Sequence, residues 1–213
     1  MSKSSSTTIE CPKCGNSQSF TIWNSINTDI DPTLKDSLVN RKLQQTDCEV
    51  CGHSSVVNYP MLYHDMSHKT LVYHLSGLNV EQLEAEEFEH LFDGYEFRTV
   101  DNWNGMIEKI KLLDANLDDR AIELFKMVVL GQLEVDLDSP LYFDEMLSNP
   151  EGKPVLSFIL VGDEAARSFS VPMESFEHFE ERVAASLDEI PLDDGKWQRI
   201  DRAYARDILD QST

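Results

Sequence analysis

Four cysteines are the residues of this sequence whose spacing most clearly indicates chemistry. They occur as "CPKCG" at residues 11–15 and "CEVCG" at residues 48–52. A Cys-x-x-Cys-Gly segment forms a tight turn in which both sulfurs can face one ion, because glycine permits the turn and nearby amides can hydrogen-bond the thiolates. Two such turns together supply four sulfurs, the ligand set of a tetrahedral Zn²⁺ site. The predicted metal ligands are Cys11, Cys14, Cys48 and Cys51.

The predicted Zn²⁺ is structural, because a shell of four thiolates leaves no coordination position for a reacting water. Iron in a rubredoxin-like site is the competing metal. Four buried free cysteines fit the paired spacing poorly, and a redox dithiol would need only one pair. His53 follows the second pair, and we expect it to stay outside the ligand set because four sulfurs are present.

The elements that must position the cysteines can be read from the residues around them. Residues 20–25 alternate with period two, which predicts a strand after the first pair. The segment "DIDPTLKDSLV" then predicts a helix, with Asp31 at the N-cap and Pro32 at the first helical position. After the second pair, "SSVVNYPMLYH", "DMSHK" and "TLVYHL" predict a strand, a turn and a second strand.

The remainder of the chain predicts helices and a small antiparallel meander. The meander consists of "LYFDEMLS", "PVLSFILV" and "RSFSVP", separated by turn residues. The expected helices cover about 79–92, 104–113, 118–130, 173–188 and 195–210.

We therefore expect an α+β protein. Its N-terminal part would be a four-cysteine zinc ribbon with an antiparallel hairpin, packed on a C-terminal part of helices and antiparallel sheet. The expected organisation is a disordered start at 1–8, a zinc-ribbon β unit at 9–79 and an acidic α+β part at 80–213. We expect the last two to share one core.

Charge is distributed unevenly along the chain. The net charge is −21; residues 1–79 hold 6 Lys+Arg and 7 Asp+Glu, which leaves 12 and 32 for the remainder. The first part is therefore near −1 and the second near −20. Such an acidic excess repels phosphate, so we expect no direct binding of nucleic acid. If an acidic face binds a partner, complementarity requires a protein with a basic surface, although most such faces only keep a protein soluble.

The expected location is the cytoplasm. The opening "MSKSSSTT" lacks the apolar core of a secretory signal, and no run approaches the roughly 18 apolar residues of a membrane helix. Paired cysteines in a reducing compartment favour metal binding over disulfides.

Five segments together resemble one known family. They are "CPKCG", "SINTDIDPTLKDSL", "CEVCGH", "YPMLYHDM" and "EKIKLLDANLDDRAIELFK", in this order over roughly residues 9–130. This arrangement resembles the CpXC family of bacteria and archaea, which is named for its paired cysteine motifs. The resemblance implies a metal-binding domain and no particular activity.

Two histidines could have a role other than a structural one. His64 and His68 have the spacing of helical metal ligands, but their context is a hairpin turn. Tyr63, His64 and Asp65 could suggest a proton relay, but adjacent strand residues point to opposite faces. We expect these residues to stabilise the hairpin turn.

A second group could be an acidic site with a basic clamp, formed by Asp118, Asp119 and Arg120. At a helix start these residues are more simply a cap, a dipole partner and a solvated arginine. The tryptophans could stack on a ligand, but large aromatics more often belong to a core or an interface. They are Trp23, Trp103 and Trp197.

Three hypotheses for function remain open. The first is an adaptor or regulatory protein whose surfaces recognise another protein. The second is an enzyme of unrecognised type with a cleft between the zinc unit and the acidic part. The third is an accessory protein of a nucleic-acid complex. No nucleophile elbow, phosphate loop or zinc-protease helix occurs in the sequence, so we assign no catalytic or cofactor-binding residues.

Overall fold

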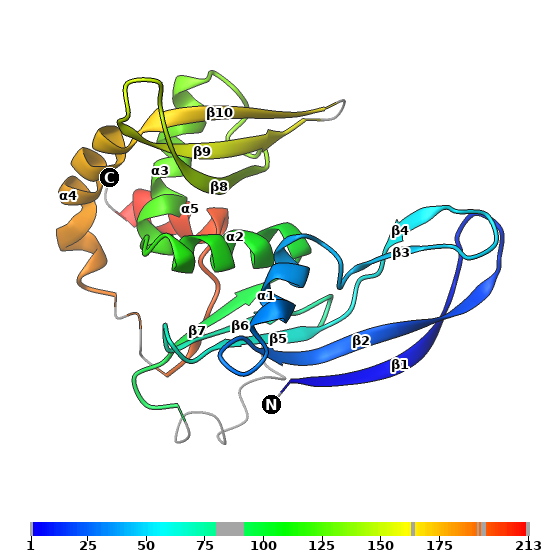
Figure 1. The fold of residues 1–213 in the computed structure, drawn as a ribbon. Helices are drawn as coiled ribbons and strands as arrows, with labels where there is room; N and C mark the ends of the chain where they lie inside the picture. Colours follow the sequence, from blue (N-terminus) through cyan, green and yellow to red (C-terminus); the bar gives the residue numbers. More distant parts are fainter. Residues whose placement is uncertain (1, 80–91, 163–164, 191, 193–194, 212–213) are drawn as a thin grey trace. The chain divides into compact units, whose positions relative to one another are not determined.

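The chain has a mixed α+β fold, as expected (Figure 1). The structure is a computed structural model, and it describes residues 2–79, 92–162, 165–190, 192 and 195–211. Its contacts divide the chain into two compact units, 1–107 with 193–198 and 108–192 with 199–213. The boundary lies inside helix α2 (Trp103–Asp114). That the four-cysteine part shares one core with the acidic part stays a prediction.

The first unit contains a six-stranded sheet in the order β1-β2-β5-β6-β7-β11 and a separate β3-β4 pair. The predicted hairpin is confirmed as the antiparallel pair β5–β6, but its first strand, expected over 54–64, splits into β4 and β5, which belong to different sheets. Three parallel pairs (β2–β5, β6–β7 and β7–β11) were not expected. The strands of this unit are β1 (Lys3–Glu10), β2 (Ser17–Asn27), β3 (Gln45–Asp47), β4 (Ser54–Val56), β5 (Met61–Asp65), β6 (Thr70–His74), β7 (Glu96–Val100) and β11 (Trp197–Gln198).

Strand β1 differs from the expected disordered start at residues 1–8. It pairs antiparallel with β2 along its whole length, from Lys3 opposite Ser25 to Glu10 opposite Ser17. A run of serine and threonine has no apolar alternation that would reveal a strand. Its order comes from the ladder to β2 and from hydroxyl contacts across it, such as Ser6 to Ser19 at 2.8 Å.

Helix α1 (Pro32–Val39) begins where the sequence predicts, with Pro32 in its first turn. Asp31 occupies the N-cap position, but its side chain makes no capping hydrogen bond. The expected helix at 79–92 falls largely on 80–91, outside the described residues. None of the helices in the described ranges is long and apolar enough to cross a membrane.

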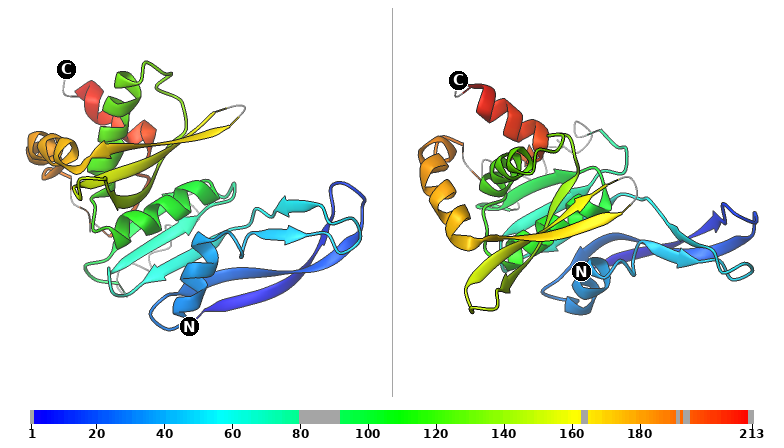
Figure 2. Two further views of the ribbon diagram at one scale, coloured as in Figure 1. Left: turned by 45° about the horizontal axis from the view of Figure 1, so that its top comes forward. Right: turned by 90° about the horizontal axis from the view of Figure 1, so that it is seen from above.

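The second unit is built on the predicted meander, an antiparallel sheet in the order β10-β9-β8. Figure 2 shows α4 continuing directly from β10, with α3 and α5 side by side. Phenylalanines join the layers: the Phe125 ring of α3 lies 5.3 to 6.4 Å from the rings of Phe158, Phe176 and Phe179. Besides the end of α2, the elements are α3 (Asp119–Gln132), β8 (Leu141–Ser148), β9 (Pro154–Val161), β10 (Ala166–Pro172), α4 (Met173–Leu187) and α5 (Arg202–Gln211).

The helix expected at 195–210 is shorter in the structure. Helix α5 begins at Arg202, and the preceding residues Trp197 and Gln198 form β11 beside β7. The Trp197 ring lies 5.2 Å from that of Phe97 and 5.9 Å from that of Tyr73. These contacts with the sheet come from residues far away in the chain, so a local pattern could not predict them.

Charged side chains are buried where α2 and α3 meet in the second unit. The Lys126 ammonium lies 3.0 Å from Glu108 Oε1 and 2.7 Å from Glu123 Oε1. Lys109 lies 2.8 Å from Asp119 Oδ2. All five residues are at most 9% exposed. This group, the buried charge network, places three carboxylates and two ammonium groups inside the unit.

Burial and neighbouring charge act in opposite directions in this network. Burial raises the pKa of Glu123, because loss of water disfavours its ionised form more than the lysines favour it. Burial disfavours the charged form of Lys126, but Glu108 and Glu123 outweigh this effect and raise the pKa of the lysine. Lys126 is therefore the cation that contacts both glutamates, and Lys109 lies farther from Glu123, at 4.0 Å.

We expect Lys126→Met to lower the free energy of unfolding by about 3–5 kcal/mol, because it removes the cation nearest to the buried carboxylates of Glu108 and Glu123. Urea denaturation of the purified protein measures the change. Lys111→Met is the matched control, since Lys111 pairs with Asp144 at a partly exposed position, where a loss of at most about 1 kcal/mol is expected. Equal effects of the two substitutions would contradict a special role of the network.

Candidate metal centre

The two cysteine pairs lie in the turns of two hairpins of the first unit. Cys11 and Cys14 lie between β1 and β2, and Cys48 and Cys51 lie between β3 and β4. In Figures 1 and 2 these two turns are at the same end of the first unit. Residues that are far apart in the sequence therefore meet at the tips of two β-ribbons.

The two cysteine turns have the same backbone geometry. In the first, the Gly15 N–H donates to the Cys11 carbonyl at 2.9 Å; in the second, the Gly52 N–H donates to the Cys48 carbonyl at 2.8 Å. Gly15 and Gly52 have φ angles of 72° and 66°, and an added Cβ would meet nothing within 4 Å at either position. Glycine is therefore favoured at both positions because the backbone is left-handed there, and not because a larger side chain would lack space.

The four sulfurs form one compact cluster. All lie within 4.8 Å of one another, with Cys11 Sγ 3.7 Å from Cys51 Sγ and Cys14 Sγ 3.6 Å from Cys48 Sγ. These separations are too long for disulfides. A tetrahedron with metal–sulfur distances of about 2.3 Å has edges of about 3.8 Å. The cluster therefore has the dimensions of a four-thiolate metal site.

The thiols strongly affect one another's protonation. Backbone N–H groups of Cys51 and Val50 lower the pKa of Cys48 to about 6. The His53 N–H favours the Cys51 thiolate, but burial and the neighbouring cysteines outweigh it and raise the pKa of Cys51 to about 12. Four thiolates this close repel one another, so ionising all of them requires a bound cation.

The donor set fits a soft or borderline divalent metal. Thiolates select zinc and iron over magnesium or calcium, which prefer oxygen ligands. Among the described residues, the group that could hold a metal consists of the four cysteines. His53 is not in this group; its carbonyl accepts a hydrogen bond from the Cys48 N–H at 3.0 Å.

Gln18 joins the two hairpins beside the cluster, a role that the sequence analysis missed. Its Nε2 donates to the Asp47 carbonyl at 3.0 Å and to Thr46 Oγ1 at 3.1 Å. Its Oε1 accepts from the Glu49 N–H at 3.1 Å, inside the second cysteine turn. Gln18 is only 9% exposed. One buried amide thus holds the second pair of cysteines against the strand that follows the first.

The structure separates His64 from its two sequence neighbours. The Tyr63 hydroxyl donates to Asp65 Oδ2 at 3.1 Å, and Asp65 Oδ1 accepts from the His68 N–H at 3.0 Å. His64 instead lies 3.3 Å from Asn27 Nδ2, and burial lowers its pKa. Asp65 therefore stabilises the hairpin turn, as expected.

Arg120 differs from the expected solvated arginine. It is 6% exposed, and its Nη1 donates to the Leu187 carbonyl at 2.8 Å, at the end of α4. Asp118 caps α3 by accepting from the Arg120 N–H at 2.8 Å, and its carboxylate also binds the guanidinium. Asp119, expected to be a dipole partner of the helix, belongs to the buried charge network.

The candidate residues considered above are divided between the two units. Asp118–Arg120 lie in the second unit, whereas His64 and Asp65 lie in the first.

Trp103 has the core role that was expected, whereas Trp197 is only half-buried. Trp103 is 5% exposed, donates to the Val57 carbonyl at 3.1 Å and stacks on the His74 ring at 4.1 Å. Trp197 packs against the sheet through β11.

The fold and the cluster define a class of protein: a mixed α+β chain in which two Cys-x-x-Cys turns meet in one four-cysteine cluster. The family model described as CpXC protein matches residues 9–126, more than half of the chain. The chain therefore belongs to the CpXC family, and the resemblance seen in its sequence is confirmed. No curated protein and no solved structure gives a match.

We expect Gln18→Ala to weaken Zn²⁺ binding roughly tenfold, because residues that orient the ligands typically contribute 10- to 100-fold to metal affinity. Competition with a chromophoric chelator measures the affinity. Gln45→Ala is the matched control, since Gln45 is an exposed residue of β3. If Zn²⁺ affinity were the same in both variants, the Gln18 amide would have no part in the site.

Proposed function

We propose that Cys11, Cys14, Cys48 and Cys51 bind one structural Zn²⁺ and that the protein is a cytoplasmic adaptor or regulatory protein. The observation that carries the metal assignment is the cluster of four sulfurs within 4.8 Å. Four thiolates saturate a tetrahedral ion, so the metal holds two hairpins together and has no position for substrate. A reducing compartment keeps such thiols available for a metal.

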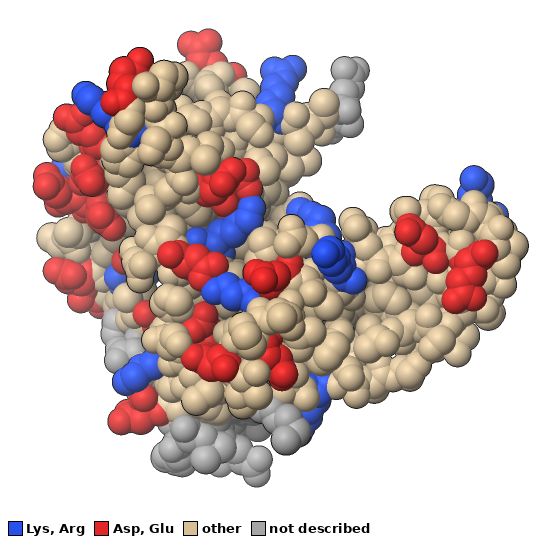
Figure 3. All heavy atoms as spheres, in the orientation of Figure 1, with Lys and Arg blue, Asp and Glu red and all other residues tan. Residues whose placement is uncertain are grey.

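Support for a partner-binding role comes from charge on the second unit. Helix α4 carries Glu174, Glu177 and Glu181, which are exposed and spaced to share one helix face. Figure 3 shows acidic side chains gathered over α4. We propose that this acidic α4 face attracts a protein with a basic surface. The acidic stretch at 81–90 lies outside the described residues, so the proposal rests on α4.

We expect the purified protein to contain one Zn²⁺ per chain and Cys11→Ser/Cys48→Ser to contain almost none. The double variant should also fail to fold, because structural zinc contributes on the order of 10–16 kcal/mol in apparent terms. Elemental analysis of protein prepared without chelator measures the metal and separates zinc from iron. Full occupancy in the double variant would refute the ligand set.

His53→Ala is the control for this experiment, since His53 is beside the cluster and outside the group of possible ligands. It should retain one Zn²⁺. Loss of the metal from this variant would show that a histidine participates.

We expect replacement of Glu174, Glu177 and Glu181 by glutamine to slow association with a partner captured from the native host. The full chain serves as bait. Charge complementarity accelerates encounter and is screened by salt. The association rate of the unmodified protein should therefore fall steeply between about 50 and about 300 mM salt.

A matched variant changes the same number of charges elsewhere: Asp36→Asn/Glu151→Gln/Asp210→Asn, at three exposed and dispersed positions. It should slow association much less. If both triple variants and the salt series leave the rate unchanged, the acidic α4 face serves only solubility.

A further inference from the structure

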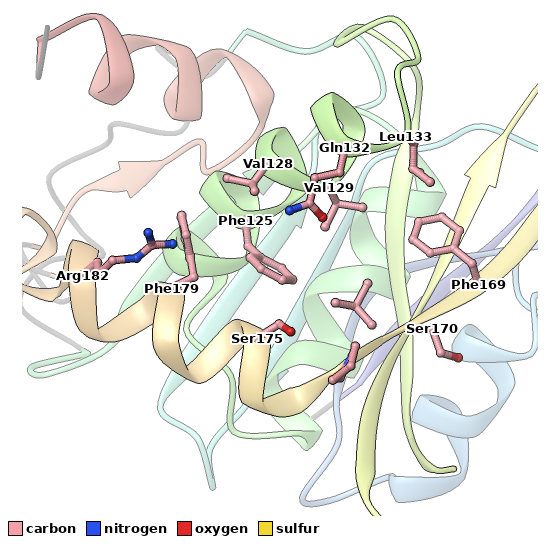
Figure 4. Close-up of a pocket in the computed structure, with 12 residues that line it drawn as sticks. Phe125, Val128, Val129, Gln132, Leu133, Phe169, Ser170, Ser175, Phe179 and Arg182 are labelled. Atoms are coloured by element: carbon pink, nitrogen blue, oxygen red, sulfur yellow. The ribbon is translucent and has the colours of Figure 1, made fainter. Parts of the chain in front are cut away.

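A cavity of about 470 Å³ lies in the second unit between α3, β10 and α4 (Figure 4). Its volume is within the range of roughly 300–1,000 Å³ that is typical of pockets for small molecules. Nothing in the metal centre or the acidic α4 face requires it. The residues that line it therefore need a separate explanation.

The walls of the cavity are mainly apolar. Phe125 and Val129 come from α3, Phe169 from β10 and Phe179 from α4. The rings of Phe125 and Phe179 lie 5.3 Å apart, and Phe125, Val129 and Phe179 are at most 7% exposed. Rings held this firmly form a rigid surface for a flat or branched apolar group.

One cation lies at the edge of this apolar surface. Arg182 of α4 lines the cavity, and its guanidinium lies over the Phe179 ring, 5.9 Å from the centroid, as Figure 4 shows. The lining contains no aspartate or glutamate. Within the part of the chain that the structure describes, no ion pair joins Arg182 to a carboxylate. The guanidinium is thus exposed, oriented by an aromatic ring and available to an anion.

Neutral polar groups complete the lining. They are Gln132 of α3, Ser170 of β10 and Ser175 of α4, and they can donate or accept hydrogen bonds. A pocket with apolar walls, a few polar groups and one charge orients a ligand by its polar end.

We propose that this cavity binds a small organic monoanion, namely a carboxylate with an aromatic or branched aliphatic body. The apolar body fills the space between Phe125 and Phe169, and the carboxylate pairs with Arg182. The net charge of −21 repels additional negative charge, so a monoanion binds better than a dianion. The same guanidinium repels a basic protein, so this site differs from the acidic α4 face.

The test uses two fluorescent probes with similar apolar bodies and the zinc-loaded full chain. One is the anion 8-anilinonaphthalene-1-sulfonate, and the other is the neutral N-phenyl-1-naphthylamine. Arg182→Gln should weaken binding of the anion roughly tenfold, because a charge-assisted contact is lost, and should change binding of the neutral probe less than about twofold. Arg167→Gln on β10, an exposed arginine outside the lining, should change neither.

Two further measurements place the probes and define the ligand class. Ser175→Phe fills the cavity from an exposed position on α4, so it should abolish binding of both probes while the unfolding midpoint stays within a few degrees. 3-Phenylpropionate should displace the anionic probe, and the neutral 3-phenyl-1-propanol and the dianion phenylsuccinate should compete more weakly. Methyl NMR shifts should centre on Val129 and Val171, which both line the cavity.

Equal loss in Arg182→Gln and Arg167→Gln would overturn the proposal. So would binding that survives in Ser175→Phe, or methyl shifts that centre elsewhere. Each outcome is independent of zinc content, which is measured separately.

Discussion

The convergence of four cysteine sulfurs is the constraint on which the first unit depends. The four cysteine sulfurs lie within 4.8 Å of one another. Cys14 and Cys48 are 34 residues apart in the chain, and Cys11 and Cys51 are 40 residues apart. Their proximity fixes the end of the β1–β2 ribbon against the end of the β3–β4 ribbon. The polar strand β1 pairs with β2 up to Glu10, the residue before Cys11. The ladder that orders this polar strand therefore runs directly into the first cysteine turn.

In the second unit, segments that are distant in the chain are held together by buried charged side chains. Glu108 accepts the Phe143 N–H at 2.6 Å and also binds Lys126, so one carboxylate connects α2, α3 and β8. Arg120 joins the start of α3 to the end of α4 through the Leu187 carbonyl. Buried charge costs desolvation energy that apolar contacts would not cost. These directional contacts fix which helix faces meet. An apolar interface alone would specify the pairing of the faces less strictly.

The parts of the structure that the sequence predicted are those encoded locally. The cysteine spacing predicts the cluster, and short-range patterns predict α1, α3, α4 and the meander. The missed parts depend on distant partners. Trp197 forms a strand because of Phe97, and Gln18 faces the second cysteine turn only after both hairpins have formed. Arg120 and Lys126 appear on the sequence as ordinary helix charges; their burial is set by segments that no local window contains.

The distribution of charge separates the kinds of molecule that the second unit can bind. Long-range attraction depends on the summed field, which is strongly negative and favours cations. Short-range recognition depends on the nearest group, and in a partly apolar cavity one guanidinium acts with less screening than it would in water. In the interactions that we propose, a basic protein surface would be drawn to α4 from a distance, whereas an anion would first have to reach Arg182 against the field. Anion binding then depends on the apolar fit between Phe125 and Phe169 for most of its affinity and on Arg182 for its orientation. Raising the salt concentration screens the long-range field in both cases, with opposite consequences. Capture of a basic protein would become slower, whereas entry of a small anion would become easier.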